Sequence, residues 1–121
     1  MSKTDDNKRI YDLITRTTKL GIAAIDLAKE LEDNYINRPI INQFIRSATS
    51  IGANYMEADC AESRKDFFHK IGICRKEAKE TIYWMDMVLR VNPHKKEICQ
   101  KLKKEATELI LIFSSIVKNK E

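Results

Sequence analysis

"FFHKIGICRKEAKETIYWMDMV", residues 67–88, repeats apolar or small side chains in alternating steps of four and three along its whole length. The repeating positions are Phe67, Ile71, Cys74, Ala78, Thr81, Met85 and Val88. This spacing places them on one face of an α-helix that packs at shallow angles, as in a coiled coil. Ser63, followed three residues later by Asp66, resembles a capping box at the start of that helix. The stretch therefore predicts a long helix over residues 64–90.

Three further segments of the chain carry the same helical period. The first covers residues 8–32, where three leucines, Leu13, Leu20 and Leu27, flank a stripe made of Ile10, Ile14, Thr17, Gly21, Ala24, Ala28 and Leu31. Pro39 suits the first turn of a second helix, over 39–60. Asn92 as N-cap and Pro93 in the first turn predict the fourth, over 93–118. Only three Gly and two Pro occur, which favours helices joined by short turns.

Four helices with short connections predict a single all-α domain over residues 1–121. The simplest arrangement is an antiparallel, up-down-up-down four-helix bundle, which needs one apolar face from each helix. The chain is 43% hydrophobic and 33% charged, the composition of a soluble globular protein. No apolar run is long enough to span a membrane, and the start "MSKTDDNKRI" lacks the apolar core of a signal peptide. We expect a cytoplasmic protein.

The three cysteines, Cys60, Cys74 and Cys99, are odd in number and far apart, without a CxxC pair. This pattern argues against a disulfide framework or a structural zinc site. We expect all three to be reduced and buried, and Cys74 and Cys99 fall on apolar stripes, where cysteine acts as a small hydrophobic residue.

Two of the predicted helices carry more apolar and small residues than one buried face requires. On the helix over 39–60, Ser50 and Ala53 fall opposite the core stripe, and Ser47 and Ala58 fall on its shoulder. On the helix over 64–90, a second stripe follows the same spacing, with Glu77 and Trp84 at its edge: His69, Ile73, Lys76, Glu80, Tyr83 and Met87. Such a patch is typical of an association surface, and the alternative is scattered surface apolar residues.

Polar residues on the same two helices predict a cluster or subunit contact made of Arg46, Asn54, Glu57, Glu77, Glu80, Tyr83, Trp84 and Met87. Arg64 and Arg75 also stand near enough to balance the carboxylates. Gly52 should lie where a neighbouring backbone, or the ring of Trp84 or Tyr83, leaves no room for a methyl group. A di-iron site would use Glu-x-x-His, and no nucleophile accompanies the carboxylates. We therefore favour a hydrogen-bonded network over a metal or acid–base site, and expect no cofactor.

The run "SIGANYMEADCAESRKDFFHKIGICRKEAKETIYWMDM", residues 50–87, closely resembles the bacterial four-helix bundle protein family, also known as 23S ribosomal RNA intervening-sequence proteins. The specific elements are "SIGAN" followed by "EA", then "SRKDF", and then "KEAKET" followed by "YW". The resemblance implies a left-handed bundle that assembles into a ring, typically a homopentamer. Some members are encoded within insertions in large-subunit ribosomal RNA genes. A similar bundle is the accessory protein of diversity-generating retroelements, which works with nucleic acid.

Nine basic residues on the last two predicted helices are candidates for nucleic-acid binding: Lys70, Arg75, Lys76, Lys79, Lys95, Lys96, Lys101, Lys103 and Lys104. The net charge of +4 permits a polyanionic partner without requiring one. In a single chain a solvated surface explains these residues slightly better, whereas a ring would repeat the patches and strengthen weak, sequence-independent binding. The sequence predicts a non-enzymatic, homo-oligomeric bundle that associates with RNA or DNA. The alternative is a scaffold for another protein.

Overall fold

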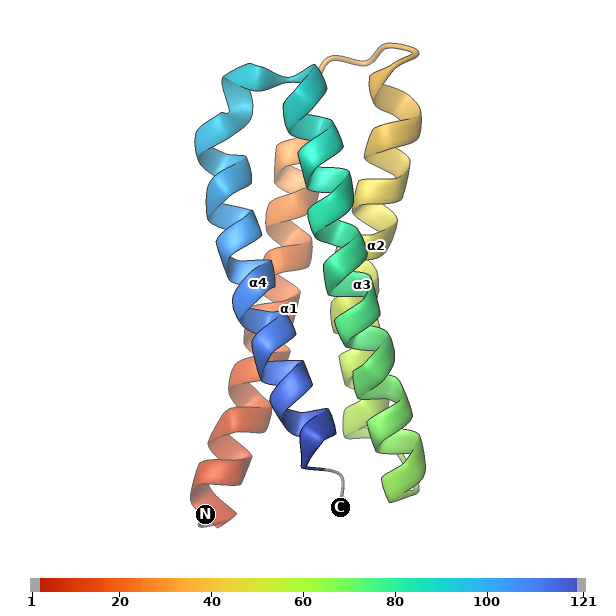
Figure 1. Cartoon of the computed structure of the whole chain (residues 1–121), viewed down its shortest axis with the longest axis vertical. Coiled ribbons are helices and arrows are strands. Elements are labelled where there is room, and N and C mark those ends of the chain that lie inside the picture. Colours follow the sequence, from red (N-terminus) through yellow and green to blue (C-terminus); the bar gives the residue numbers. More distant parts are fainter. Residues whose placement is uncertain (1–2, 120–121) are drawn as a thin grey trace.

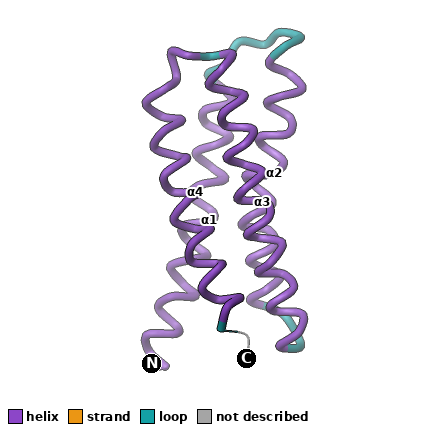
Figure 2. Tube along the Cα trace, viewed as in Figure 1, coloured by secondary structure: helices purple, strands orange, loops and turns teal. Residues whose placement is uncertain are grey.

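Four long α-helices make up most of residues 3–119, the part of the chain that the computed structural model describes, with side chains from residue 12 onward. They are α1 (Lys3–Lys29), α2 (Asn37–Asp59), α3 (Arg64–Val91) and α4 (Lys96–Lys118), with a short 3₁₀ turn, η1 (Pro93–Lys95), before α4. Successive helices run antiparallel, so both termini lie at the same end (Figure 1). Figure 2 shows helices and loops only in this described part. The predicted all-α four-helix bundle is confirmed.

Side chains organise the start of α3 and the loop before α2. Ser63 Oγ accepts a hydrogen bond from the Asp66 backbone N–H at 3.0 Å, as the sequence predicts. The loop before α2 is organised by Asn34, whose Oδ1 accepts from the backbone N–H groups of Ile36 at 3.1 Å and Asn37 at 2.8 Å. Asn92 occupies the N-cap position of η1 and Pro93 follows it, as predicted, but the buried Asn92 side chain bonds elsewhere and makes no cap hydrogen bond.

The core lies along the axis of the bundle and is built from the predicted stripes. Of the predicted stripe on α3, every residue except the half-buried Phe67 is buried. On α1 the centre of the stripe shifts toward the three leucines expected at its flank, Leu13, Leu20 and Leu27. On α2, Ser47 and Ala58 are buried rather than on a shoulder, because the face of α2 that meets α3 is wider than one stripe.

Two glycines mark the close approach of α1 and α2. A Cβ added at Gly52 would lie 3.4 Å from Thr17 Oγ1 and 3.5 Å from the Thr17 backbone, and one at Gly21 would lie 3.7 Å from the Ala48 carbonyl. The prediction that the ring of Trp84 or Tyr83 crowds Gly52 is therefore wrong. The neighbouring group is Thr17 of α1, at distances of ordinary van der Waals contact, so the expectation that a methyl group has no room at Gly52 is also wrong.

Two of the three cysteines are buried and one is exposed, and none forms a disulfide. Cys74 and Cys99 are buried as predicted, and the Cys74 thiol donates to the Ile51 carbonyl at 3.5 Å. Cys60 is exposed just after α2, so the expectation that it is buried is wrong. It follows the last residue of the helix, where the apolar stripe has already ended.

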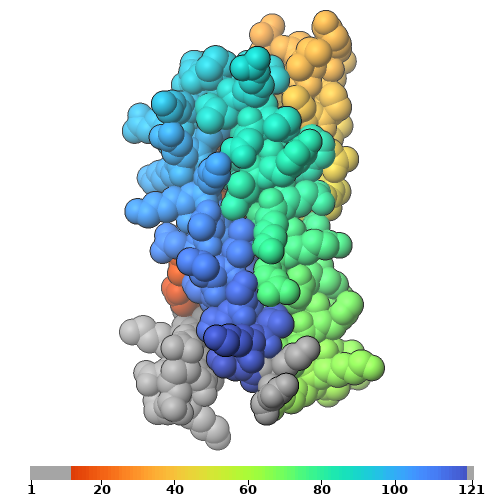
Figure 3. Space-filling model, viewed as in Figure 1, coloured from red at the N-terminus to blue at the C-terminus, as the bar shows by residue number. Residues whose placement is uncertain are grey.

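The helices pack around the bundle unequally. α2 and α3 are in closest contact, whereas α1 packs well on α2 and only loosely on α4. Figure 3 shows the face that α3 and α4 cover together. Within residues 3–119 no helix has the length and apolar character needed to cross a membrane. The loose contact between α1 and α4 leaves a groove that matters for the site.

Candidate functional site

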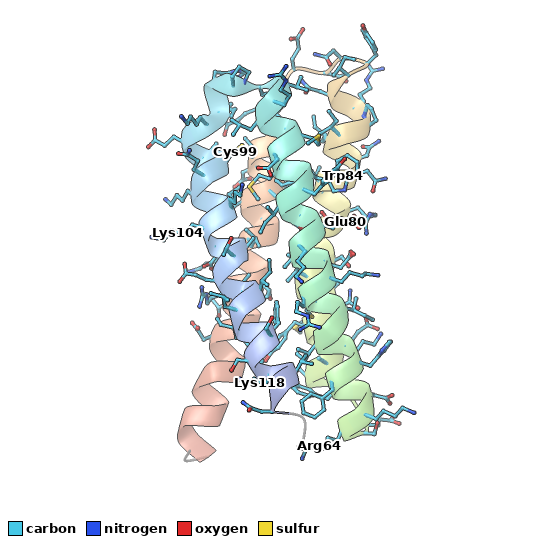
Figure 4. All side chains as sticks on the ribbon, viewed as in Figure 1. Arg64, Glu80, Trp84, Cys99, Lys104 and Lys118 are labelled. Carbon is cyan, nitrogen blue, oxygen red and sulfur yellow. The ribbon has the colours of Figure 1, made fainter. Side chains whose placement is uncertain are left out.

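An ion-pair network joins α2 to α3 at part of the predicted polar cluster. Arg46 Nη1 lies 2.9 Å from Glu77 Oε2, and its Nη2 contacts Glu80. Trp84 Nε1 donates to Glu80 Oε2 at 3.3 Å. The Glu77 side chain is only 6% exposed, whereas Arg46 is 46% exposed and covers it from the solvent side. Figure 4 shows Glu80 and Trp84 on the side of α3 that faces α2. The network holds these two helices in register.

The remaining polar residues of the predicted cluster lie apart from this network. Asn54 Nδ2 donates to the carbonyl and the hydroxyl of Ser50, both at 2.9 Å, one turn earlier in α2. Glu57 instead pairs with Lys70 at 3.3 Å. The Arg64 guanidinium lies 5.3 Å from the centre of the Phe68 ring. The structure therefore divides the predicted cluster into an Arg46 network, a Glu57–Lys70 pair and a local Asn54 contact.

The aromatic residues of the predicted association surface differ in exposure. Tyr83 is 54% exposed, and its ring packs edge to face on Trp84 with centroids 5.0 Å apart. Trp84 is half-buried and packs against the core, and Met87 is also half-buried. The exposed part of this surface is centred on Tyr83.

A second apolar surface lies between α1 and α2, and of the small-residue face predicted opposite the α2 core stripe it includes Ala53. Its groove of about 270 Å³ has a floor of small residues that includes Gly21, Gly52 and Ala53. Ile22 and Met56 stand at its edges, 53% and 47% exposed. The helical period of α1 alone could have shown Ile22 off the core stripe, but not that it would border a groove with α2.

Three of the nine predicted nucleic-acid-binding residues are engaged in ion pairs. Lys70 pairs with Glu57 at 3.3 Å, Lys95 with Glu30 at 2.5 Å and Lys103 with Asp86 at 3.2 Å. The hydrogen bond from Lys95 lowers the pKa of the Glu30 carboxyl. These lysines connect neighbouring helices and are less available to an external anion.

The other predicted basic residues do not form one continuous patch. Arg75 is half-buried, and five lysines are exposed and make no ion pair with any side chain of residues 12–119: Lys76, Lys79, Lys96, Lys101 and Lys104. The first two lie on α3 and the others on α4. In Figure 4, Lys104 lies on the side of α4 away from α3. The exposed cations thus divide between two faces.

Lys101 and Lys104 reach the groove between α1 and α4, where a third lysine joins them. Lys19 of α1, not predicted from the sequence, lines the same groove. The groove measures about 420 Å³, and its other lining residues are Leu20, Ala23, Leu102, Glu105 and Glu108. Nothing in the local pattern around Lys19 distinguishes it from other surface lysines, so only the packing of α1 beside α4 identifies it.

No three His, Cys, Asp or Glu side chains among the described residues are grouped so that they would hold a metal ion. The described surface carries exposed lysines and exposed apolar side chains, which are features that can bind another molecule. These features define an all-α four-helix bundle with basic side chains on two faces and apolar surfaces beside α2.

The 23S rRNA-intervening sequence protein family matches residues 10–115, and the chain belongs to this family. It is also similar to a crystal structure of a protein with unknown function from the S23 ribosomal protein family of Bacteroides thetaiotaomicron VPI-5482. The two are 32% identical, with a TM-score of 0.83, and the match covers 91% of this chain and 98% of the other. No curated protein matches the chain.

Proposed function

We propose that the protein is a cytoplasmic, non-enzymatic, homo-oligomeric bundle that associates with RNA or DNA through repeated basic patches. The observation that carries the proposal is the set of exposed lysines without ion pairs among residues 12–119 described above, Lys76, Lys79, Lys96, Lys101 and Lys104. Their ammonium groups are free to replace counterions along a phosphate backbone. The family's description, which refers to an intervening sequence of 23S rRNA, supports the same direction.

Assembly of several copies would multiply the positive charge that one chain offers to a polyanion. The chain carries a net charge of +4, which is too little for strong attraction by a monomer. Tyr83 and the neighbouring Met87 on α3 provide an apolar contact for a second copy, and a ring, typically a pentamer in the family that the sequence resembles, repeats each lysine around its axis. Several weak phosphate contacts on one strand then act together.

The salt dependence of co-purifying nucleic acid tests this function. Protein purified at low salt should carry the excess ultraviolet absorbance of nucleic acid, and high salt should remove it, because counterion release weakens as salt rises. Light scattering before and after nuclease treatment separates the mass of the protein assembly from that of bound nucleic acid. A protein that is free of nucleic acid at low salt and binds neither RNA nor DNA on titration would contradict the proposal.

A scaffold for another protein is the second candidate, favoured by the α1/α2 groove and by Tyr35, which is 82% exposed in the loop before α2. Exposed tyrosines are frequent anchors in protein interfaces. Under this alternative the protein purifies without nucleic acid and retains a defined polypeptide.

A further inference from the structure

Three lysine side chains from two helices border one groove in the part of the chain that the structure describes. Lys19 extends from α1, and Lys101 and Lys104 extend from α4. All three are exposed, and none forms an ion pair with a side chain of residues 12–119. Lys101 and Lys104 are three positions apart on α4, which separates their Cα atoms by about 4.5 Å along the axis. The groove therefore presents positive charge from both of its walls.

The two carboxylates that line the groove face an arginine of α1 rather than the groove lysines. Arg16 of α1 binds Glu105 of α4 through two hydrogen bonds, at 2.6 and 3.1 Å, and lies 3.9 Å from Glu108. The bond to Glu105 raises the pKa of the guanidinium, which stays charged. This pair also bridges α1 and α4 where their packing is otherwise loose. Neither carboxylate forms an ion pair with any of the three groove lysines, so the three ammonium groups are available to an external anion.

The shape of the groove favours one class of anion. It lies between two antiparallel helices, and its volume is within the range of clefts that hold small ligands or single residues of a polymer. A single-stranded backbone can lie along such a channel, whereas the wide cylinder of a duplex cannot enter it. The floor of Leu20, Ala23 and Leu102 offers apolar side chains and no side-chain hydrogen-bonding group that would select a base.

We propose that the α1/α4 groove holds the phosphodiester backbone of single-stranded nucleic acid, with Lys19, Lys101 and Lys104 as its phosphate contacts. The inference rests on the proposed function and makes it specific, because it names the groove in which a single strand lies and adds Lys19 to the lysines that contact it. It also predicts little dependence on base sequence. Lysine suits this role because its flexible ammonium group meets a phosphate as a point charge.

The test compares two triple variants by fluorescence anisotropy with labelled single-stranded oligothymidylate. The groove variant is Lys19→Gln, Lys101→Gln and Lys104→Gln. The control carries the same change in charge at three exposed lysines that lie outside the groove and outside the candidate binding residues, Lys29→Gln, Lys65→Gln and Lys118→Gln. The groove variant should lose at least about tenfold in affinity at low salt, and the slope of log affinity against log salt should fall by about 2, or about 0.7 for each lost contact. The affinity of the control for the oligonucleotide should change by less than about threefold.

Each other outcome has a separate meaning. If both variants bind alike, the groove assignment is overturned while nucleic-acid association stands. If the unmodified protein binds no oligonucleotide, the proposed function fails and the inference fails with it. Equal binding of a duplex of the same length overturns the single-strand assignment, and equal competition by inorganic polyphosphate overturns the assignment to nucleic acid. Circular dichroism melts of both variants confirm that the bundle is retained.

Discussion

The side-chain amides of Asn37 and Asn92 hydrogen-bond to each other across the loop end of the bundle, although they are 55 positions apart. Asn92 Nδ2 donates to Asn37 Oδ1 at 3.0 Å, and Asn37 Nδ2 lies 3.4 Å from Asn92 Oδ1. Each amide also donates to a nearby backbone carbonyl, that of Glu32 at 2.9 Å and that of Val88 at 3.0 Å. Both residues are buried. The pair therefore connects the α1–α2 loop to the turn before α4.

Removing one member of this pair should destabilise the fold. Asn92→Ala leaves the Asn37 amide buried without its partner, so the free energy of unfolding should fall by about 1 to 3 kcal/mol. The exposed Asn42→Ala is the control and should change it by no more than about 0.5 kcal/mol. Urea titrations of Asn37→Ala, of Asn92→Ala and of the variant that carries both changes measure the coupling between the two amides. Strictly additive effects would show that the two amides do not stabilise each other.

The Arg46 network predicts an asymmetry between two ion pairs. Arg46→Met leaves the Glu77 carboxylate buried without its cation and should cost about 1 to 3 kcal/mol, less than for a fully buried pair because Arg46 is half exposed. Lys103→Met breaks the exposed pair with Asp86 and should cost less than about 0.5 kcal/mol. Adding Glu77→Gln to Arg46→Met should recover part of the loss. Chemical denaturation measures all three, and equal costs at Arg46 and Lys103 would refute the argument.

Two glycines on neighbouring helices should respond in opposite ways to larger side chains. A Cβ at Gly72 would meet nothing within 4 Å, so Gly72→Ala should stabilise the protein by about 0.5 to 1 kcal/mol through helix propensity. Gly52→Leu should destabilise it by about 1 to 3 kcal/mol, because the side chain would press on the α1 backbone at Thr17. Thermal melts should show a higher melting temperature for Gly72→Ala and a lower one for Gly52→Leu than for the parent. A Gly52→Leu variant as stable as the parent would mean that α1 and α2 are not closely packed there.

The proposed assembly depends on the surface around Tyr83. Tyr83→Glu with Met87→Glu places charge on an apolar contact without altering a residue of the buried core, so the oligomer should dissociate while the helical content stays unchanged. Leu111→Glu, at a 66% exposed position of α4, is the control for added charge and should keep the native size. Light scattering and circular dichroism on the same samples give both readouts. An assembly of parental size in the double variant would place the subunit contact elsewhere.

Alkaline conditions should weaken the bundle through two buried groups. Burial raises the pKa of the Cys74 thiol from 9.0 to about 12 and that of the Tyr55 hydroxyl from 10.0 to about 12. The folded state therefore keeps protons that the unfolded chain releases. The resulting stability is complete below about pH 9 and is lost as the pH rises toward 12, by at most about 1.4 kcal/mol per pH unit for each group. Urea titrations across this range should show a shallower decline for Cys74→Ala. An unchanged slope in that variant would exclude the thiol as a cause.

The helices and their buried faces were predictable because side-chain direction is a local property. Within one helix, spacing alone places Ile71, Cys74 and Ala78 on one side, and all three are buried. The Ser63 cap was predictable for the same reason, since it joins residues three apart. The position of Asn92 at an N-cap was predictable too, but its hydrogen-bond partner was not, because a buried residue of another helix competes for its side chain.

The candidate site shows where local spacing stops being informative. Lys101 and Lys103 are two positions apart and so point in different directions, as the sequence already requires. Only the structure shows that Lys103 reaches Asp86 on α3 while Lys101 borders a groove with Lys19 of α1. A helical period gives the angle of a side chain about its own axis and does not identify the helix that it meets.

The sequence by itself determined the four helices, the apolar face of each and the family to which the chain belongs. The tertiary structure alone decided that Thr17 packs against Gly52, that the predicted polar cluster divides between Arg46 and Lys70, and that three lysines share the α1/α4 groove. The physical reason is the range of the interactions. Helix formation and amphipathicity depend on residues within a few positions of one another, whereas the neighbour across each interface depends on how segments far apart in the chain pack together.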